Sequence, residues 1–328
     1  MRRRALLGGG PLAAAALAAA CGSFEDPSIV IDARILAIAA EPPEQVTPFD
    51  PQDPLDVTFG PVEVCAIVAD PGVVRGLAWS MEACAPQSGG RRCSDSRPSL
   101  FMGAGTLDDP ETAATPQVAC ATLPPGPPLL ALLRDAVEND SLSGFGGIDL
   151  SVSLRVVPAG GGEAAALYGT KAVRYSPQLP AERVANANPT LEQIAVDRGP
   201  GTTPAPLPLG RCADQAAPLA LGPEETLHFE PVEPPGARED YVVPTFEGGS
   251  RRFTENLRYQ WLAGGGDWTR RSTGGPRDGA GNEPPLDTEW ESPPADQLAG
   301  PTDLPLWVIQ RDERGGLRWF ESCVRVIP

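Results

Sequence analysis

The stretch IDLSVSLRV at residues 148–156 alternates apolar and polar side chains at every position. Successive side chains of a strand point to opposite faces, so this alternation predicts a strand with one buried face and excludes an amphipathic helix. A second run, LRYQWLA at 257–263, sets Leu257, Tyr259 and Trp261 against Arg258 and Gln260. Further strands are predicted at 28–40, 62–70, 76–84, 166–176, 191–197 and 225–232. The chain is therefore expected to be all-β.

One segment has the helical period instead. Residues 127–140 begin with two prolines and carry an apolar stripe that predicts a single short helix. The C-terminal run 305–327 predicts a hairpin, because Gly315 and Gly316 supply the positive φ of a tight turn. A phosphate loop at these glycines would need a helix after them, whereas LRWFESCVRV predicts a strand.

The two halves of the chain have a similar order of predicted strands. Each half begins with one strand, continues with a strand that contains a tryptophan, and ends with a pair of strands. A tryptophan in a middle strand is typical of immunoglobulin-like sandwiches. We therefore predict two tandem immunoglobulin-like β-sandwiches with long Pro/Gly-rich loops. The expected segments are a signal peptide at 1–20, a tether at 21–27, a sandwich at 28–176 with the helix at 127–140, a linker at 177–189 and a second sandwich at 190–328.

The N-terminus predicts export. Arg2, Arg3 and Arg4 precede a short apolar stretch that ends in three alanines and Cys21, which resembles the lipobox of bacterial lipoproteins. The resemblance implies that Cys21 becomes the acylated N-terminus and anchors the protein to a membrane. The absence of Asp after Cys21 favours the outer membrane, with the protein on its periplasmic or surface face. Two alternatives stay open, an ordinary cleaved signal with Cys21 as a thiol and a twin-arginine signal at Arg3 and Arg4.

Lipidation of Cys21 leaves six of the seven cysteines for disulfides. An exported protein meets an oxidising compartment, so three bridges are expected. If pairing stays within each predicted sandwich, Cys212 must bond Cys323. For the first sandwich we predict Cys84 with Cys93 and Cys65 with Cys120.

Three stretches together resemble uncharacterised Gram-negative surface lipoproteins with immunoglobulin-like domains. They are RILAIAAEPPEQVTPFDP at 34–51, NANPTLEQIAVD at 186–197 and LPLWVIQRDERGGLRWFESCVRV at 304–326. The resemblance implies a fold and a location, and it brings no catalytic residue.

Charge and motifs exclude several function classes. The net charge of −17 opposes a nucleic-acid partner. His228 is the one histidine, in a predicted strand, so HExxH and multi-histidine zinc sites are excluded, and there is no GxSxG or Walker sequence. We expect no catalytic residue, cofactor or metal site. Calcium ligation is the less favoured reading of Asp50, Asp53 and Asp56, and of Asp278, Asn282 and Glu283, beside solvated turns.

Trp268 and Trp290 lie in polar, Gly-rich surroundings, which predicts exposed side chains that stack on a glycan or anchor a protein. Trp261 is assigned to the core. The expected function is a non-catalytic outer-membrane lipoprotein acting as a cell-surface binding or structural module. The alternatives are a carbohydrate-active hydrolase that uses paired carboxylates and an accessory lipoprotein subunit of an envelope complex.

Overall fold

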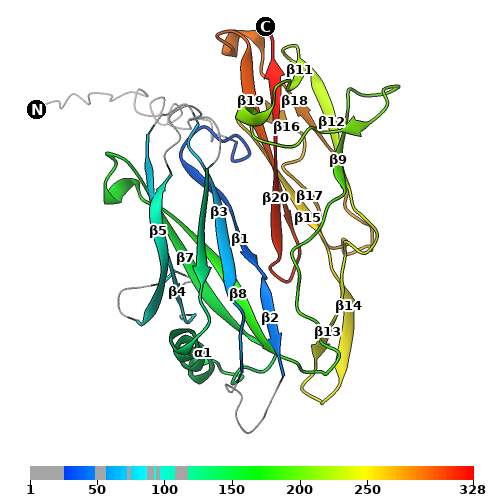
Figure 1. Cartoon of the computed structure of the whole chain (residues 1–328). Helices are drawn as coiled ribbons and strands as arrows, with labels where there is room; N and C mark the ends of the chain where they lie inside the picture. The colour runs from blue at the N-terminus through cyan, green and yellow to red at the C-terminus, as the bar shows by residue number, and fades with distance from the viewer. Residues whose placement is uncertain (1–25, 49–56, 72–74, 87–91, 94–96, 108–116) are drawn as a thin grey trace, which may run out of the picture.

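The chain folds into two β-sandwiches on either side of a strand-free connection at 178–192 (Figure 1). The computed structural model describes residues 26–48, 57–71, 75–86, 92–93, 97–107 and 117–328. Both sandwiches have the strand order of immunoglobulin-like domains, so the predicted fold class is confirmed.

The first sandwich packs the sheet β1-β3-β6 against the sheet β2-β8-β7-β4-β5. Its strands are β1 (Arg34–Glu41), β2 (Glu44–Thr47), β3 (Val62–Ala69), β4 (Leu77–Cys84), β5 (Ser99–Leu107), β6 (Gln117–Leu123), β7 (Ile148–Pro158) and β8 (Leu167–Pro177). Paired strands are antiparallel except β2, which runs parallel to β8. The chain therefore begins in one sheet with β1 and crosses to the other with β2.

The second sandwich repeats this arrangement with the sheets β10-β9-β12-β18-β16 and β11-β20-β19-β15-β17. Its strands are β9 (Gln193–Asp197), β10 (Ala205–Pro206), β11 (Leu219–Leu221), β12 (Thr226–Val232), β15 (Arg258–Ala263), β16 (Asp267–Trp268), β17 (Ser272–Gly274), β18 (Thr288–Glu291), β19 (Thr302–Arg311) and β20 (Leu317–Val326). Here β11 runs parallel to the last strand, as β2 does in the first sandwich. The predicted C-terminal hairpin is β19–β20, and Gly315 in its turn has a φ of +99°.

A separate two-stranded hairpin, β13 (Asp240–Pro244) with β14 (Ser250–Thr254), belongs to neither sandwich. It leaves the second sandwich between β12 and β15 and descends beside the first (Figure 1). We call it the arm. Three short 3-10 turns, Glu163–Ala165, Cys212–Asp214 and Ala295–Gln297, complete the regular structure of the described residues.

The predicted helix is α1 (Pro127–Asn139), which lies at the lower end of the first sandwich in Figure 1. Its apolar stripe buries Leu129, Leu132, Leu133 and Ala136 in the first core. The missing N–H of a proline costs nothing in the first helical turn, which explains why the helix starts at Pro127.

Strand β7 departs from simple alternation because both of its faces are covered. Ser151 and Ser153, expected on an open polar face, are 6% and 5% exposed. Cys93 lies over them, and its backbone N–H donates to Ser153 Oγ at 2.7 Å. Cys93, held by its disulfide to Cys84, therefore covers part of the outer face of this strand.

All three predicted disulfides are present. Cys65 and Cys120 join the paired strands β3 and β6, and Cys84 bonds Cys93. Cys212 bonds Cys323 in β20 across a separation of 111 residues.

The predicted opening strand at 28–40 is divided between the two sandwiches, which corrects the expectation of one strand. Ser28 O accepts from Ala263 N–H at 2.9 Å, and Val30 N–H donates to Ala263 O at 2.8 Å, so this part pairs with β15. The first sandwich begins only at Arg34. Asp26 fixes the start of the segment, because its carboxylate accepts from the Ser28 N–H and hydroxyl.

Candidate functional site

The two predicted ligand-binding tryptophans are core residues, so that prediction is wrong. Trp268 is 6% exposed and Trp290 is fully buried. They face each other across the β16–β18 pairing, and Trp290 Nε1 donates to Gly265 O at 3.0 Å. The strands that carry them are only two and four residues long. In strands of this length, alternation of apolar and polar residues does not show which side chains face the core.

The remaining predicted sites are turns or lie outside the described residues. Cys21 and the acidic run Asp50, Asp53 and Asp56 lie outside them. The Asp278 carboxylate accepts from the backbone N–H groups of Ala280 and Asn282, both at 2.9 Å, and Glu283 pairs with Arg277. These contacts are those of a solvated turn.

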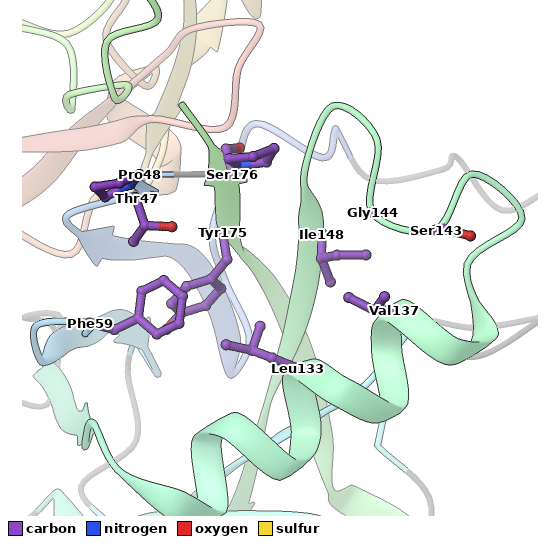
Figure 2. Close-up of a pocket in the computed structure, with 11 residues that line it drawn as sticks. Thr47, Pro48, Phe59, Leu133, Val137, Ser143, Gly144, Ile148, Tyr175 and Ser176 are labelled. Atoms are coloured by element: carbon purple, nitrogen blue, oxygen red, sulfur yellow. The ribbon is translucent and has the colours of Figure 1, made fainter. Parts of the chain in front are cut away.

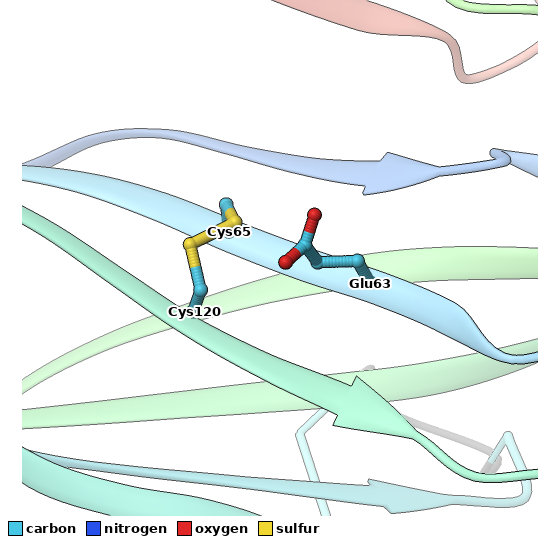
Figure 3. Close-up of side chains that lie close together, drawn as sticks. All are labelled: Glu63, Cys65 and Cys120. Atoms are coloured by element: carbon cyan, nitrogen blue, oxygen red, sulfur yellow. A yellow bond between two sulfur atoms is a disulfide. The ribbon is translucent and has the colours of Figure 1, made fainter.

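Glu63 lies beside Cys65 and Cys120, and one potential ligand atom of each residue lies within 4.8 Å of the others (Figure 3). The two sulfurs are bonded to each other, so neither is a thiolate. A metal needs the thiolate form of cysteine. The cluster is therefore a disulfide with an exposed acid next to it.

His228 lies on β12, and its ring lies between two carboxylates. Its Nδ1 lies 3.3 Å from Asp197 Oδ2, and its Nε2 lies 3.6 Å from Asp287 Oδ2. No serine or cysteine nucleophile among the described residues is hydrogen-bonded to the ring. The geometry is that of a partly exposed structural histidine between two acidic side chains.

The most unusual feature is the junction of the two sandwiches, which sequence analysis did not predict. An apolar cluster spans it, with β1 and β3 on one side and β15, β19 and β20 on the other. Trp307 and Ile67 within it are fully buried. The residues of this cluster are Val30, Leu36, Ala37, Ile67, Ala69, Leu262, Trp307, Ile309 and Leu317.

A buried ionic network continues this junction around Glu44 of β2. Its carboxylate accepts from Arg183 Nη2 at 2.8 Å, Arg314 Nη2 at 2.9 Å, Ser176 Oγ at 2.6 Å and Asn186 N–H at 2.8 Å. Burial alone would raise the pKa of Glu44, but the bonds from Ser176, Asn186 and Arg183 outweigh it and hold the pKa below its usual range. Because Arg314 belongs to the β19–β20 turn, the network joins one sandwich to the other.

A cavity of about 370 Å³ opens beside this network, between the first sandwich, the arm and the β19–β20 turn. We call it the interdomain cavity. Glu44, Arg174 and Arg183 line one side, and Tyr241 and Arg314 line the other. Tyr241 donates to Glu313 at 2.8 Å, and the Arg314 guanidinium lies 4.8 Å from the centre of the Tyr241 ring. The arm also touches the first sandwich at its tip, where Phe246 stacks on Phe145 at 5.1 Å.

The arginines of the interdomain cavity are already paired. Arg174 Nη1 donates to Asp149 at 3.0 Å, and Arg183 and Arg314 both bond Glu44. Such charge-assisted bonds hold the surrounding elements in place. The cavity therefore has a polar wall whose arginine side chains are held by ion pairs.

Two buried groups near the cavity have shifted pKa values. Burial lowers the pKa of Lys171 to about 8, and its ammonium donates to Gly315 O of the other sandwich. Burial, then the charge of Asp312, raises the pKa of Glu255 to about 7. Glu255 is only 3% exposed and its carboxylate contacts Arg314 at 3.2 Å. A raised carboxyl pKa is a feature of glycosidase acids, but this carboxyl does not line the cavity.

No protein-family model and no curated protein matches the chain. Among solved structures it is similar to the periplasmic chaperone SfaE at 11% identity, with a TM-score of 0.24 and coverage of 89% of this chain and 99% of that one. At this identity and score the likeness adds nothing to the topology described above. Within the described residues, no helix has the length and apolarity needed to cross a bilayer.

Proposed function

We propose that the protein is an exported, lipid-anchored, non-catalytic module that binds or braces a partner outside the cytoplasm. Three disulfides support an oxidising compartment. The basic start, the short apolar stretch and Cys21 support export with lipidation. The periplasmic or surface side of the outer membrane is the proposed location.

The observation that carries this proposal is that the chain is bound to the second sandwich a few residues after Cys21. Asp26 is bonded to Arg271 of the second sandwich at 2.6 Å, and Ser28 and Val30 pair with β15. Five residues from Cys21 to Asp26 span at most about 18 Å. An acylated Cys21 would therefore hold the junction of the sandwiches close to the membrane.

A short anchor also gives the module an orientation. The described chain begins at the upper end in Figure 1, whereas α1 and the tip of the arm lie at the lower end. An anchor at the start directs α1 and the tip of the arm away from the lipid. Because the two sandwiches share a buried core and an ionic network, they present these features as one rigid unit.

The test is an intact mass of the protein purified from its own membranes, before and after reduction and alkylation. We expect a chain that begins at Cys21 with added acyl mass, and six cysteines that react only after reduction. The Cys21→Ser variant should no longer be found in the membrane fraction. Its three disulfides should remain intact. An unmodified Cys21, or alkylation without reduction, would contradict the proposal.

The arm favours an accessory subunit as the second candidate function. Its tip exposes Phe246 at 78% and its strand β14 exposes Phe253 at 38%. Exposed aromatic side chains on one projecting hairpin are typical of protein-binding surfaces. Detergent extracts should then yield a stoichiometric partner that is lost with Phe246→Asp, while Phe101→Asp on the distant strand β5 serves as the control. If the wild type and the control variant are both purified as monomers without a partner, the accessory-subunit function is contradicted.

A further inference from the structure

Two smaller cavities differ in the chemistry of their walls. One, of about 80 Å³, lies beside α1 and is lined mostly by apolar side chains, among them Phe59, Leu133 and Ile148 (Figure 2). It is a gap in the packing of the first core and points to no ligand. The other, of about 190 Å³, lies at the junction between β1, β3 and β20, and its wall includes Glu63 and Cys65. Carboxylate and reduced cysteine side chains are metal ligands, so the second cavity has the chemistry of a binding site.

The Cys65–Cys120 disulfide beside this cavity is the most exposed of the three. Cys120 is exposed and Cys65 is half-buried. Each of the other two bridges contains a cysteine that is at most 2% exposed, Cys84 or Cys323. Exchange requires a thiolate to reach a sulfur, and exposed bridges are therefore the labile ones. An external thiol should attack Cys120 before any other bridged cysteine.

Opening this bridge would leave its two strands in place. β3 pairs with β6 over seven consecutive residues, and the bridge joins the central pair. Val64 and Ala66, the neighbours of Cys65, are fully buried in the first core. Glu63 lies two residues before Cys65 and therefore on the same outer face of the sheet. The backbone ladder and the core would hold the reduced cysteines beside each other and beside Glu63.

Reduction would turn this cluster into a set of three metal ligands. One potential ligand atom each of Glu63, Cys65 and Cys120 lies within 4.8 Å of the others (Figure 3). Tetrahedral bonds of about 2.3 Å place two sulfurs about 3.8 Å apart on Zn²⁺. Side-chain rotation can give that separation, because the two Cα atoms are 4.1 Å apart. Three protein ligands leave the fourth position of a tetrahedral zinc ion open to water.

We propose that Cys65, Cys120 and Glu63 form a Zn²⁺ site that the disulfide closes and a dithiol reductant opens. A thiolate of the dithiol bonds to Cys120 Sγ, the bridge breaks, and its electron pair leaves on Cys65 Sγ, which takes the proton that the attacking thiol had lost. The second thiol of the reductant then displaces Cys120 in the same way, so the dithiol becomes a disulfide and the bridge gains two electrons. Zn²⁺ replaces the protons of the two cysteine thiols and releases both. The site is separate from the interdomain cavity and does not depend on lipidation.

The first test asks which bridge opens. The Cys21→Ser protein, which has no seventh thiol, is treated with dithiothreitol for increasing times, and free thiols are blocked with N-ethylmaleimide and located by peptide mass. We expect Cys65 and Cys120 to be blocked at least about 10-fold faster than the other four cysteines, with the circular dichroism of the sheets unchanged. Equal rates, or loss of that signal as this bridge opens, would overturn the proposal.

The second test measures metal binding by the oxidised protein and by the protein with this one bridge open. The reductant is removed under inert gas, and Co²⁺ and then Zn²⁺ are titrated. We expect one Co²⁺ per reduced chain, with the absorption band of thiolate-to-metal charge transfer, and its loss when Zn²⁺ displaces Co²⁺. The oxidised protein should bind neither ion here. Glu63→Gln should weaken Zn²⁺ binding at least about 10-fold, since even residues that only support a metal ligand contribute that much.

Glu41→Gln is the matched control. Glu41 lies directly opposite Glu63 on β1, is exposed and lines the same cavity, but does not belong to the ligand set. Removing its charge should weaken Zn²⁺ binding no more than about 3-fold, the effect of one exposed charge. Equal losses in the two variants would mean attraction by charge in place of ligation by Glu63. That result, or a reduced protein without the charge-transfer band, would overturn the proposal.

Discussion

The two sandwiches share the order of eight strands, to which the second adds β10 and β16 at the edges of one sheet, and they differ most in what fills their cores. The first core is largely aliphatic, with alternating Val, Leu and Ala side chains from β3, β6 and β7. The second contains a cluster of large rings. Its aromatic members are Phe229, Tyr259, Trp261, Trp268 and Trp290, and neighbouring ring centres lie between 5.3 and 6.5 Å apart.

The tryptophan of the middle strand shows the difference most clearly. Trp261 on β15 is fully buried, and its Nε1 donates to Thr273 at 2.9 Å. Trp79 on the corresponding strand β4 is half-buried and lies over Gly103 and Gly105 of the edge strand, where a Cβ at Gly105 would lie 3.0 Å from the indole nitrogen. The fold therefore needs an inward-facing residue at this position, and a buried tryptophan is one way to supply it.

The disulfides should give the largest single effect, at the long bridge of the second sandwich. The Cys212–Cys323 bridge closes a loop of 111 residues and the Cys84–Cys93 bridge a loop of 9. In the chain-entropy model their loss costs about 5 and about 2.5 kcal/mol. Urea denaturation of the paired Cys→Ser variants measures both values. Equal losses would mean that loop length does not set the contribution of a disulfide to the free energy of unfolding. The first sandwich would then depend on its short bridge as strongly as the second depends on its long one.

The two tryptophans should differ next. Trp261→Ala should destabilise by about 4 kcal/mol, because it opens a cavity in a ring cluster that cannot collapse. Trp79→Ala should cost about 1 kcal/mol, because part of the indole already faces solvent. Urea unfolding of both variants, followed by circular dichroism, tests the pair. Similar losses would contradict the assignment of different packing roles to this strand.

Sequence analysis predicted features that depend on neighbours along the chain. Alternation placed β7 and β15, and parity with the predicted domains required only the Cys212–Cys323 bridge. The two bridges of the first sandwich were one choice among the possible pairings of its four cysteines, and the structure has that pairing. The junction could not be predicted in this way, because Glu44 and Arg314 meet across 270 residues and neither has a distinctive local pattern. Trp268 was misassigned because a two-residue strand has no period. The arm was missed because most of its residues are exposed, so no alternation marks it.

Glu44 should decide whether the sandwiches unfold together. Glu44→Gln leaves Arg183 and Arg314 without their shared counter-charge, at a cost of about 3 kcal/mol. Calorimetry should then show two transitions in place of one. The pKa of Glu44 is lowered from 4.5, so its contribution is present above about pH 4.5 and is lost as pH falls towards the folded-state pKa. The exposed Glu63→Gln is the control, and a split transition in that variant would contradict a specific coupling role.

Glu255 should give the second sandwich a pH dependence of the opposite direction. Its pKa is raised from 4.5 to about 7, so the folded state holds a proton that the unfolded chain has released, and stability falls as pH rises through this window. The expected loss between about pH 5 and about pH 8 is about 2 kcal/mol. Lys171 has a pKa lowered to about 8, so it acts at higher pH, where it makes stability rise with pH.

Glu255→Gln should reduce this slope by about half, because burial also raises the pKa of Glu321 in β20 to about 7 and that residue keeps the same pH dependence. Glu239→Gln is the matched control, because Glu239 also contacts Arg314, at 3.4 Å, but lies at the edge of the cluster with its side chain 36% exposed. Urea midpoints at the two pH values measure the slope in each variant. If Glu255→Gln leaves the slope at its full size, Glu255 does not hold the proton, and the junction would then stabilise a charged carboxylate at Glu255 as it does at Glu44. That result would mean that Glu44 and Glu255 are both ionised in the folded state. The two sides of the junction would then not differ in how their stability depends on pH.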